Sequence, residues 1–153
     1  MLLDMNDLLR AFPTKTQSLE VLFVLNGKKP VSRMCVNLPS VPAIKEFCKN
    51  RSLFFAAGDA RFTMAFQGNY SSKGEVDPAG SFLFIYIGKR NGDVLIAKRY
   101  EALQDIASLG PLLGYPSCCV DFFLKHRVKE ESGLHDFVAP ALTGARLFSY
   151  QNN

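Results

Sequence analysis

The stretch Gly-Tyr-Pro-Ser-Cys-Cys at residues 114–119 holds the most chemically reactive side chains of this sequence, and we call it the cysteine corner. Two thiols, Cys118 and Cys119, directly follow a Gly-Tyr-Pro turn. Pro116 suits the first turn of a helix, because a proline has no N–H group that would need a partner there. Unpaired N–H groups and the helix dipole favour negative charge in that turn. We therefore expect a thiol here to lose its proton more easily and to act as a nucleophile, redox group or ligand.

Four residues are the candidate catalytic set: Cys118, Cys119, Tyr115 and His135. One thiol would be the nucleophile or the redox group, and Tyr115 would donate a hydrogen bond at the mouth of the site. His135 would serve as an acid–base group or as a ligand. The alternative is structural: Cys119 is a small buried residue, Cys118 is incidental, and Tyr115 packs over the turn.

Cys118 and Cys119 are also candidate metal ligands, with zinc or iron as the metal. The chain has 2 histidines, His126 and His135. Cys119 and His126 share a helix face but lie two turns apart, roughly 10 Å along the axis, which is too far to hold one ion. A metal would therefore need His135 or a residue of another chain, and His126 is expected to be a residue of the helix end. A disulfide between the two cysteines would need a distorted turn, because successive helical residues point about 100° apart.

Composition predicts a single globular domain, with 153 residues of which 48% are hydrophobic and 21% charged. No apolar run approaches the roughly 18 residues that span a bilayer. Asp4 and Asp7 stand where a signal peptide would carry basic residues, so we expect the cytoplasm and no membrane partner. The net charge of +4 comes from scattered Lys and Arg, which favours solvated faces over a nucleic-acid surface. In a cytosolic protein, cysteines are thiols or ligands rather than disulfides.

The residue pattern predicts an α+β fold, with an antiparallel sheet built from hairpins, flanking helices and a helix-rich C-terminal third. The single domain would cover 1–153, with a sheet-rich part at 1–98 and a helical part at 99–153 that carries the cysteine corner. Two hairpins are predicted from Asn-Gly turns, with arms 19–25 and 31–37 about Asn26-Gly27 and arms 82–87 and 94–97 about Asn91-Gly92. Two more strands, 53–57 and 61–67, would turn at Gly58-Asp59, followed by a loop over 69–80.

Helical spacing predicts four helices, over 2–11, 41–51, 99–110 and 117–131. Ser40 would cap the second helix, and its inner face would include Cys48 as a small core residue. In the third helix Leu103 would face inward and Gly110 would end the helix. The fourth helix begins within the cysteine corner, so its first turn would hold both thiols.

The stretch LGPLLGYPSCCVDFF at residues 109–123 resembles a family of uncharacterised prokaryotic proteins, domain of unknown function 483. That family carries a Leu-Gly-Tyr-Pro-x-Cys-Cys-Val-x-Phe signature. The matching positions are Leu113, Gly114, Tyr115, Pro116, Cys118, Cys119, Val120 and Phe123, with Ser117 as the variable one. Related proteins have a further cysteine-bearing segment after a stretch like LFSYQNN. The resemblance thus implies a site at the two cysteines to which a partner contributes, or which this chain holds in part; it implies no reaction.

Two functions follow as hypotheses. The first is a thiol- or metal-centred site at the cysteine corner, working on or with a partner. The second is a non-catalytic binding or assembly module that forms a homo-oligomer, because 13 Phe residues and several strands suit association. Nucleic-acid binding by the basic turns is a third idea, but GKRNGD lacks the spacing of a phosphate-binding loop.

Overall fold

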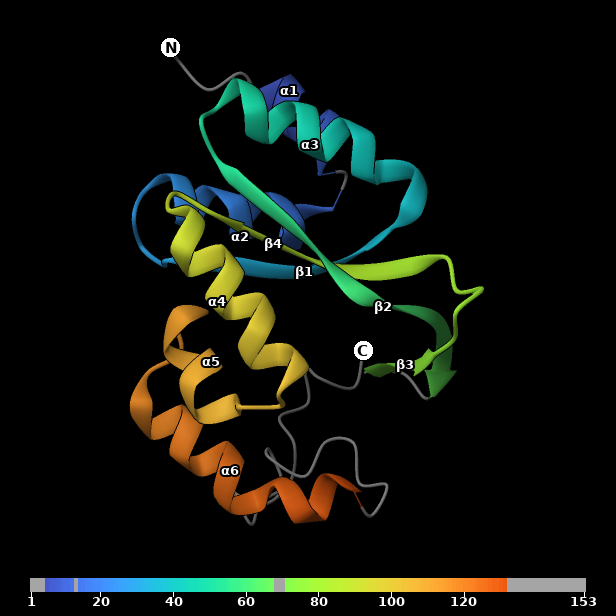
Figure 1. Cartoon of the computed structure of the whole chain (residues 1–153), viewed down its shortest axis with the longest axis vertical. Helices are drawn as coiled ribbons and strands as arrows, with labels where there is room; N and C mark the ends of the chain where they lie inside the picture. The colour runs from blue at the N-terminus through green and yellow to red at the C-terminus, as the bar shows by residue number, and fades with distance from the viewer. Residues whose placement is uncertain (1–4, 13, 68–70, 132–153) are drawn as a thin grey trace, which may run out of the picture.

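A four-stranded antiparallel sheet forms the centre of the computed structural model, which describes residues 5–12, 14–67 and 71–131. The strands are β1 (Val31–Asn37), β2 (Phe54–Gln67), β3 (Ser71–Val76) and β4 (Phe82–Gly88). Their order in the sheet is β1-β4-β2-β3, so β4, the last of the described strands, lies inside the sheet between β1 and β2 (Figure 1). The predicted α+β class with an antiparallel sheet is confirmed. The single-domain assignment and its division after residue 98 stay predictions.

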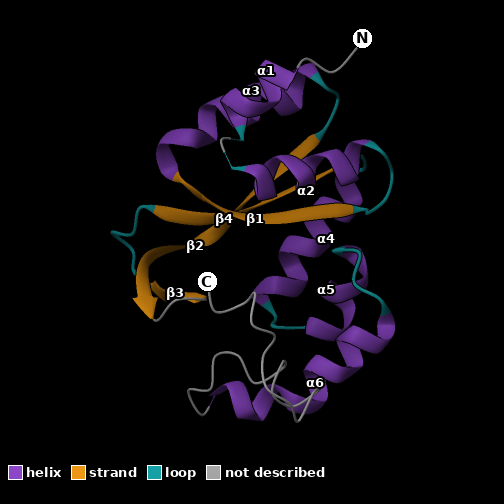
Figure 2. Ribbon diagram, turned by 180° about the vertical axis from the view of Figure 1, so that it is seen from behind, coloured by secondary structure: helices purple, strands orange, loops and turns teal. Residues whose placement is uncertain are grey.

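Helices cover both faces of the sheet (Figure 2). One face packs against α1 (Met5–Ala11), α2 (Lys15–Leu25) and α3 (Val41–Asn50), and the other against α4 (Asn91–Ala102) and α5 (Ile106–Leu112). The last helix, α6 (Ser117–Glu131), packs on α5. Strand β4 serves both layers because successive side chains of a strand point to opposite faces. Ile85 and Ile87 belong to the core under α1–α3, whereas Tyr86 belongs to the core under α4 and α5.

The first predicted hairpin is wrong, because its first arm is helix α2. Asn26-Gly27 ends this helix and does not turn between two strands. The Gly27 N–H donates to the Val24 carbonyl and the Lys28 N–H to the Phe23 carbonyl, at 3.0 and 2.8 Å. Gly27 has φ +67. This is the Schellman arrangement of a helix end, which requires the same left-handed glycine as a hairpin turn.

In the second predicted hairpin the first arm is a strand, but the predicted turn and second arm are wrong. Strand β4 forms as expected, but Asn91-Gly92 opens helix α4. Along this helix Val94 and Ala97 are buried while Leu95 and Ile96 are exposed. That spacing of three is helical, because a strand would bury alternate residues. A short apolar run fits either element until its packing partner is known.

Three other elements differ from their predictions. Residues 54–67 form one strand, with a register irregularity between Ala57 and Arg61 in place of a turn. Strand β3 occupies part of the expected loop 69–80. The expected helix 99–110 is divided between α4 and α5, so Leu103 lies 64% exposed between them and Gly110 lies inside α5.

The N-terminal helix and α3 agree with prediction within the described residues. Cys48 is a buried core residue of α3, as expected. Ser40 makes no side-chain capping bond, because a short 3-10 turn (Leu38–Ser40) precedes α3. None of the helices in the described ranges combines the length and the apolar character that crossing a membrane requires.

Candidate thiol site at the start of α6

The cysteine corner is shaped by two glycines with different roles. Gly114 has φ +82, a left-handed conformation that favours glycine, and a Cβ atom there would come within 2.9 Å of the Lys29 Cβ. Gly110 lies in α5 so close to α6 that a Cβ atom on it would clash with Cγ2 of Val120. The first glycine turns the chain and the second lets α6 rest on α5. Both glycines therefore have a structural role, one in the turn that precedes α6 and one in the contact between α5 and α6.

The start of α6 is fixed by backbone hydrogen bonds. The Tyr115 N–H donates to the Gly110 carbonyl at 3.1 Å. The Pro116 carbonyl accepts from the N–H groups of Cys119 and Val120, at 3.0 and 3.1 Å. Helix α6 begins at Ser117, so Cys118 and Cys119 occupy its first turn, as predicted.

Cys118 and Cys119 are exposed free thiols, whereas Cys35 is half-buried and Cys48 is buried. The structural alternative that made Cys119 a buried residue is therefore wrong. Val120, the next residue, is the one that turns inward and packs in the α5–α6 contact. No packing function accounts for the pair of sulfurs, which face solvent together.

The expectation that the helix start would ease proton loss does not hold for Cys119. Its pKa is raised, first because its thiol hydrogen-bonds with Cys118 and second because a negative charge on Cys118 repels one on Cys119. Burial contributes least to the raised pKa. The ionisation of the Cys119 thiol therefore depends chiefly on its neighbour Cys118.

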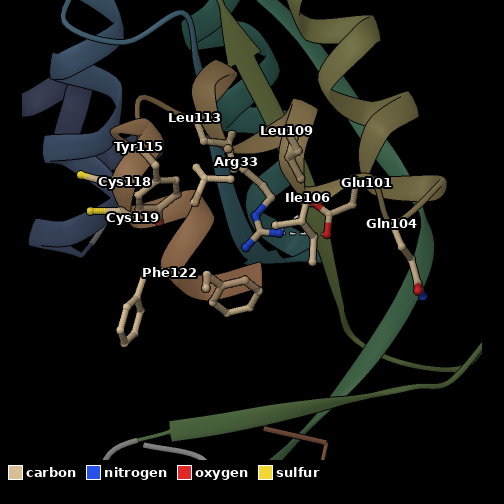
Figure 3. A pocket seen from close by; sticks show the side chains of 13 residues that line it. Arg33, Glu101, Gln104, Ile106, Leu109, Leu113, Tyr115, Cys118, Cys119 and Phe122 are labelled. Atoms are coloured by element: carbon tan, nitrogen blue, oxygen red, sulfur yellow. Dashed lines mark hydrogen bonds and ion pairs between the residues drawn. The ribbon is translucent and has the colours of Figure 1, made fainter. Parts of the chain in front are cut away.

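A cavity of about 780 Å³ opens beside the corner, between the sheet, α5 and α6 (Figure 3). Its apolar lining consists of Ile106, Leu109, Leu113, Val120, Phe122 and Phe123. Its polar lining consists of Arg33, Glu101, Gln104, Tyr115, Cys118 and Cys119. In Figure 3 the two sulfur atoms point away from Arg33 and Glu101, so the cysteines stand at the rim. Tyr115 also lines the cavity and is 59% exposed.

Arg33 and Glu101 form an ion pair in the cavity wall that sequence reasoning missed. The Arg33 Nη1 donates to both Glu101 carboxylate oxygens, at 2.8 and 2.7 Å. Tyr86 also hydrogen-bonds with Glu101, and its pKa is raised, chiefly by burial and then by the Glu101 charge. These residues belong to β1, α4 and β4, and Arg33 and Glu101 are 68 positions apart. In the sequence, the one sign of this ion pair is that Arg33 is a single charged residue within the predicted strand 31–37.

A third metal ligand is not found among the side chains that the structure describes. No three His, Cys, Asp or Glu residues gather there in an arrangement that could hold an ion. The backbone of His126 lies in α6, but its side chain is not described. His135 lies outside the described residues. A zinc or iron site at Cys118 and Cys119 would therefore need ligands from beyond the described part of the chain.

Comparison of the chain with protein-family models, curated proteins and solved structures gives no match. The resemblance of residues 109–123 to domain of unknown function 483 stays a prediction. The roles of Cys118, Cys119, Tyr115 and His135 likewise stay predictions, of which the structure brings the first three to one rim.

Proposed function

We propose that the protein is a thiol protein whose reactive centre is the Cys118–Cys119 pair. The observation that carries this proposal is that both cysteines are exposed and line the rim of a cavity large enough for a small molecule. Thiols reserved for packing are buried, as Cys48 is in this chain. Exposed neighbouring thiols in the first turn of a helix suit chemistry better than packing.

In this proposal Cys118 is the nucleophile and Cys119 the hydrogen-bond donor. Cys118 gives its proton to water, and its thiolate then forms a bond with an electrophilic carbon or sulfur atom of the substrate. The leaving group departs with the electron pair of the bond that breaks. Cys119 keeps its proton and stabilises the thiolate, which is the direction in which its pKa is shifted. Tyr115 lies at the rim, where its hydroxyl could donate to the substrate.

The test is alkylation of the folded protein with iodoacetamide near neutral pH, with each modified site identified by mass spectrometry. Cys118 is expected to react at least about tenfold faster than Cys35, because it is exposed and an acceptor for its neighbour's thiol. Cys48 is expected to stay unmodified, because burial raises its pKa to about 12. Cys35 and Cys48 thus serve as controls within the same molecule.

Single variants assign the roles within the pair. Cys119→Ser keeps a hydrogen-bond donor beside Cys118 and should keep most of the fast reaction, whereas Cys118→Ser should remove it. A Cys118 thiol that reacts no faster than the thiol of a short Cys-Cys peptide would contradict the proposal. The same protein, purified without oxygen and assayed for zinc and iron, decides whether the pair holds a metal instead.

The resemblance to domain of unknown function 483 supports the same pair of residues and names no reaction. We propose the cytoplasm as the location, where cellular reductants would keep such thiols reduced. A protein partner that docks over the rim would bring its substrate group to Cys118.

The assembly module remains a second proposal, favoured by apolar side chains on α2. Leu19 and Phe23 lie one helical turn apart and are 51% and 45% exposed. Light scattering of the wild type and of a Leu19→Ser/Phe23→Ser variant tests it, with Cys118→Ser as the control. An oligomer that only the α2 variant dissociates would support assembly through this face, and a monomer at every concentration would exclude it.

A further inference from the structure

We propose that the cavity binds a small molecule with an apolar body and a terminal carboxylate, and that Arg33 is the anion-binding residue. This inference names a ligand class for the proposed thiol site. It rests on the proposed function only in assuming that the bound molecule reacts with a thiol at the rim of the cavity. The binding itself does not depend on thiol chemistry and can be measured without it.

The size and lining of the cavity fit a small molecule. Its volume of about 780 Å³ falls within the usual range for such sites, roughly 300–1,000 Å³. Six of its lining side chains are apolar, and the other lining residues include one cation, Arg33, beside the Glu101 carboxylate. A cavity of this type buries an apolar body and uses a few polar groups to fix its orientation.

Arg33 has hydrogen-bonding capacity to spare. Only Nη1 contacts Glu101, and it contacts both carboxylate oxygens. Nε and Nη2 form the opposite edge of the guanidinium group, which is turned away from Glu101 in Figure 3. Among the side chains that the structure describes, none accepts a hydrogen bond from that edge. Two parallel N–H groups on a planar edge match the two oxygens of a carboxylate.

The guanidinium group is also held in place before any ligand arrives. Its Cζ lies 4.8 Å from the centre of the Phe84 ring, and its Nη1 is fixed by Glu101. Glu101 is held in turn by Tyr86. The Arg33 and Glu101 side chains are 34% and 27% exposed, so the free edge remains accessible. Preorganisation of this type lowers the entropic cost of binding.

Glu101 has a second effect, which gives the proposal its sharpest test. Its negative charge holds Arg33 but also repels an incoming carboxylate. In Glu101→Gln the amide oxygen can still accept a hydrogen bond from Nη1, while the repulsion disappears. An anionic ligand should therefore bind this variant more tightly, and a neutral ligand of the same shape should not.

The experiment compares decanoate with decanamide by titration calorimetry. The wild type should bind decanoate about tenfold more tightly, as a charge-assisted pair allows. Arg33→Gln should abolish this preference, and Glu101→Gln should increase it. Lys98→Gln is the matched control: it removes a cation of α4 that pairs with Asp59 and does not line the cavity. Its preference should equal that of the wild type.

The proposal is overturned if both ligands bind equally, if neither binds, or if Arg33→Gln keeps the preference. If Arg33→Gln does not fold, the Glu101→Gln variant provides the test. An unchanged preference for decanoate over decanamide in that variant would show that Arg33 does not bind the carboxylate. The Cys118→Ser/Cys119→Ser variant separates this proposal from the thiol function. In that variant the preference for decanoate over decanamide should persist, because Arg33 sets it, even where alkylation shows no fast thiol.

Discussion

Gly110 of α5 lies directly against Val120 of α6, with no room for a Cβ atom between them. The contact brings the backbone of one helix onto the side chain of the next. Because Val120 follows Cys119, it also fixes where the first turn of α6 points its thiols. The position of the two exposed thiols therefore depends on Gly110, a residue that has no side chain.

Gly110→Ala is expected to lower the free energy of unfolding by about 1–3 kcal/mol, because the added methyl group overpacks the contact. Urea unfolding measures the loss, and the alkylation rate of Cys118 shows whether α6 has moved. Adding Val120→Ala should restore part of the stability, because the two changes share one contact.

Gly92→Ala is the matched control for this substitution. Gly92 lies in α4 with no heavy atom within 4 Å of the position of a new Cβ. Alanine should therefore leave stability unchanged or raise it by up to about 1 kcal/mol, as its higher helix propensity allows. Equal losses at both glycines would show that close packing of Gly110 against Val120 is not the cause.

Cys118→Ser should shift the alkylation profile of Cys119 to lower pH. In the wild type the hydrogen bond and charge of Cys118 raise the pKa of the Cys119 thiol. A serine hydroxyl does not ionise in this range, so the charge effect disappears in the variant. The rate of Cys119 alkylation measured from pH 6 to 10 gives the comparison, and an unchanged midpoint would show that the thiols act independently.

Cys48 should make the protein less stable in alkaline solution. Burial raises its pKa from 9.0 to about 12 in the folded chain, so the unfolded thiol loses its proton first. The contribution of the Cys48 thiol to the free energy of unfolding is fully present below pH 9 and is lost as the pH rises above it. The expected loss between pH 8 and pH 10 is about 1.4 kcal/mol. Urea unfolding of the wild type and Cys48→Ala at both pH values isolates the effect; parallel losses would refute it.

Glu101→Ala should cost about 1–3 kcal/mol of stability, because Arg33 and Tyr86 both lose the acceptor that Glu101 provides. Glu101→Gln should cost clearly less, since its amide oxygen still accepts a hydrogen bond. Thermal and urea unfolding of the two variants measure the difference. Equal stability of both would mean that Arg33 and Tyr86 find other partners.

The fold class and the place of the thiols could be predicted, but two helices could not. Asn-Gly supplies a left-handed residue, and both a hairpin turn and a helix end use one. The Asn26-Gly27 pair therefore fits a hairpin turn and a helix end equally well. Residues 94–97 are apolar throughout, so their helical burial became visible only where Val94 and Ala97 meet the sheet.

The parts of the candidate site whose residues are adjacent in sequence could be placed in advance, whereas the parts that the fold assembles were missed. Cys118 and Cys119 are neighbours in sequence, and the preceding proline marks the helix start. Arg33 and Glu101 meet only because α4 packs on the face of the sheet to which Arg33 of β1 belongs. The pKa direction of Cys119 was missed for another reason, because the prediction weighed the helix dipole and left out the adjacent thiol.

The position of β4 inside the sheet has a consequence for how the chain is made. A ribosome delivers β1, β2 and β3 before the strand that joins β1 to β2. Until residues 82–88 emerge, β1 and β2 each have an unpaired edge, which can attract other nascent chains. Synthesis that pauses just before β4 would thus prolong the stage most exposed to misassembly, and a chaperone would be needed most there.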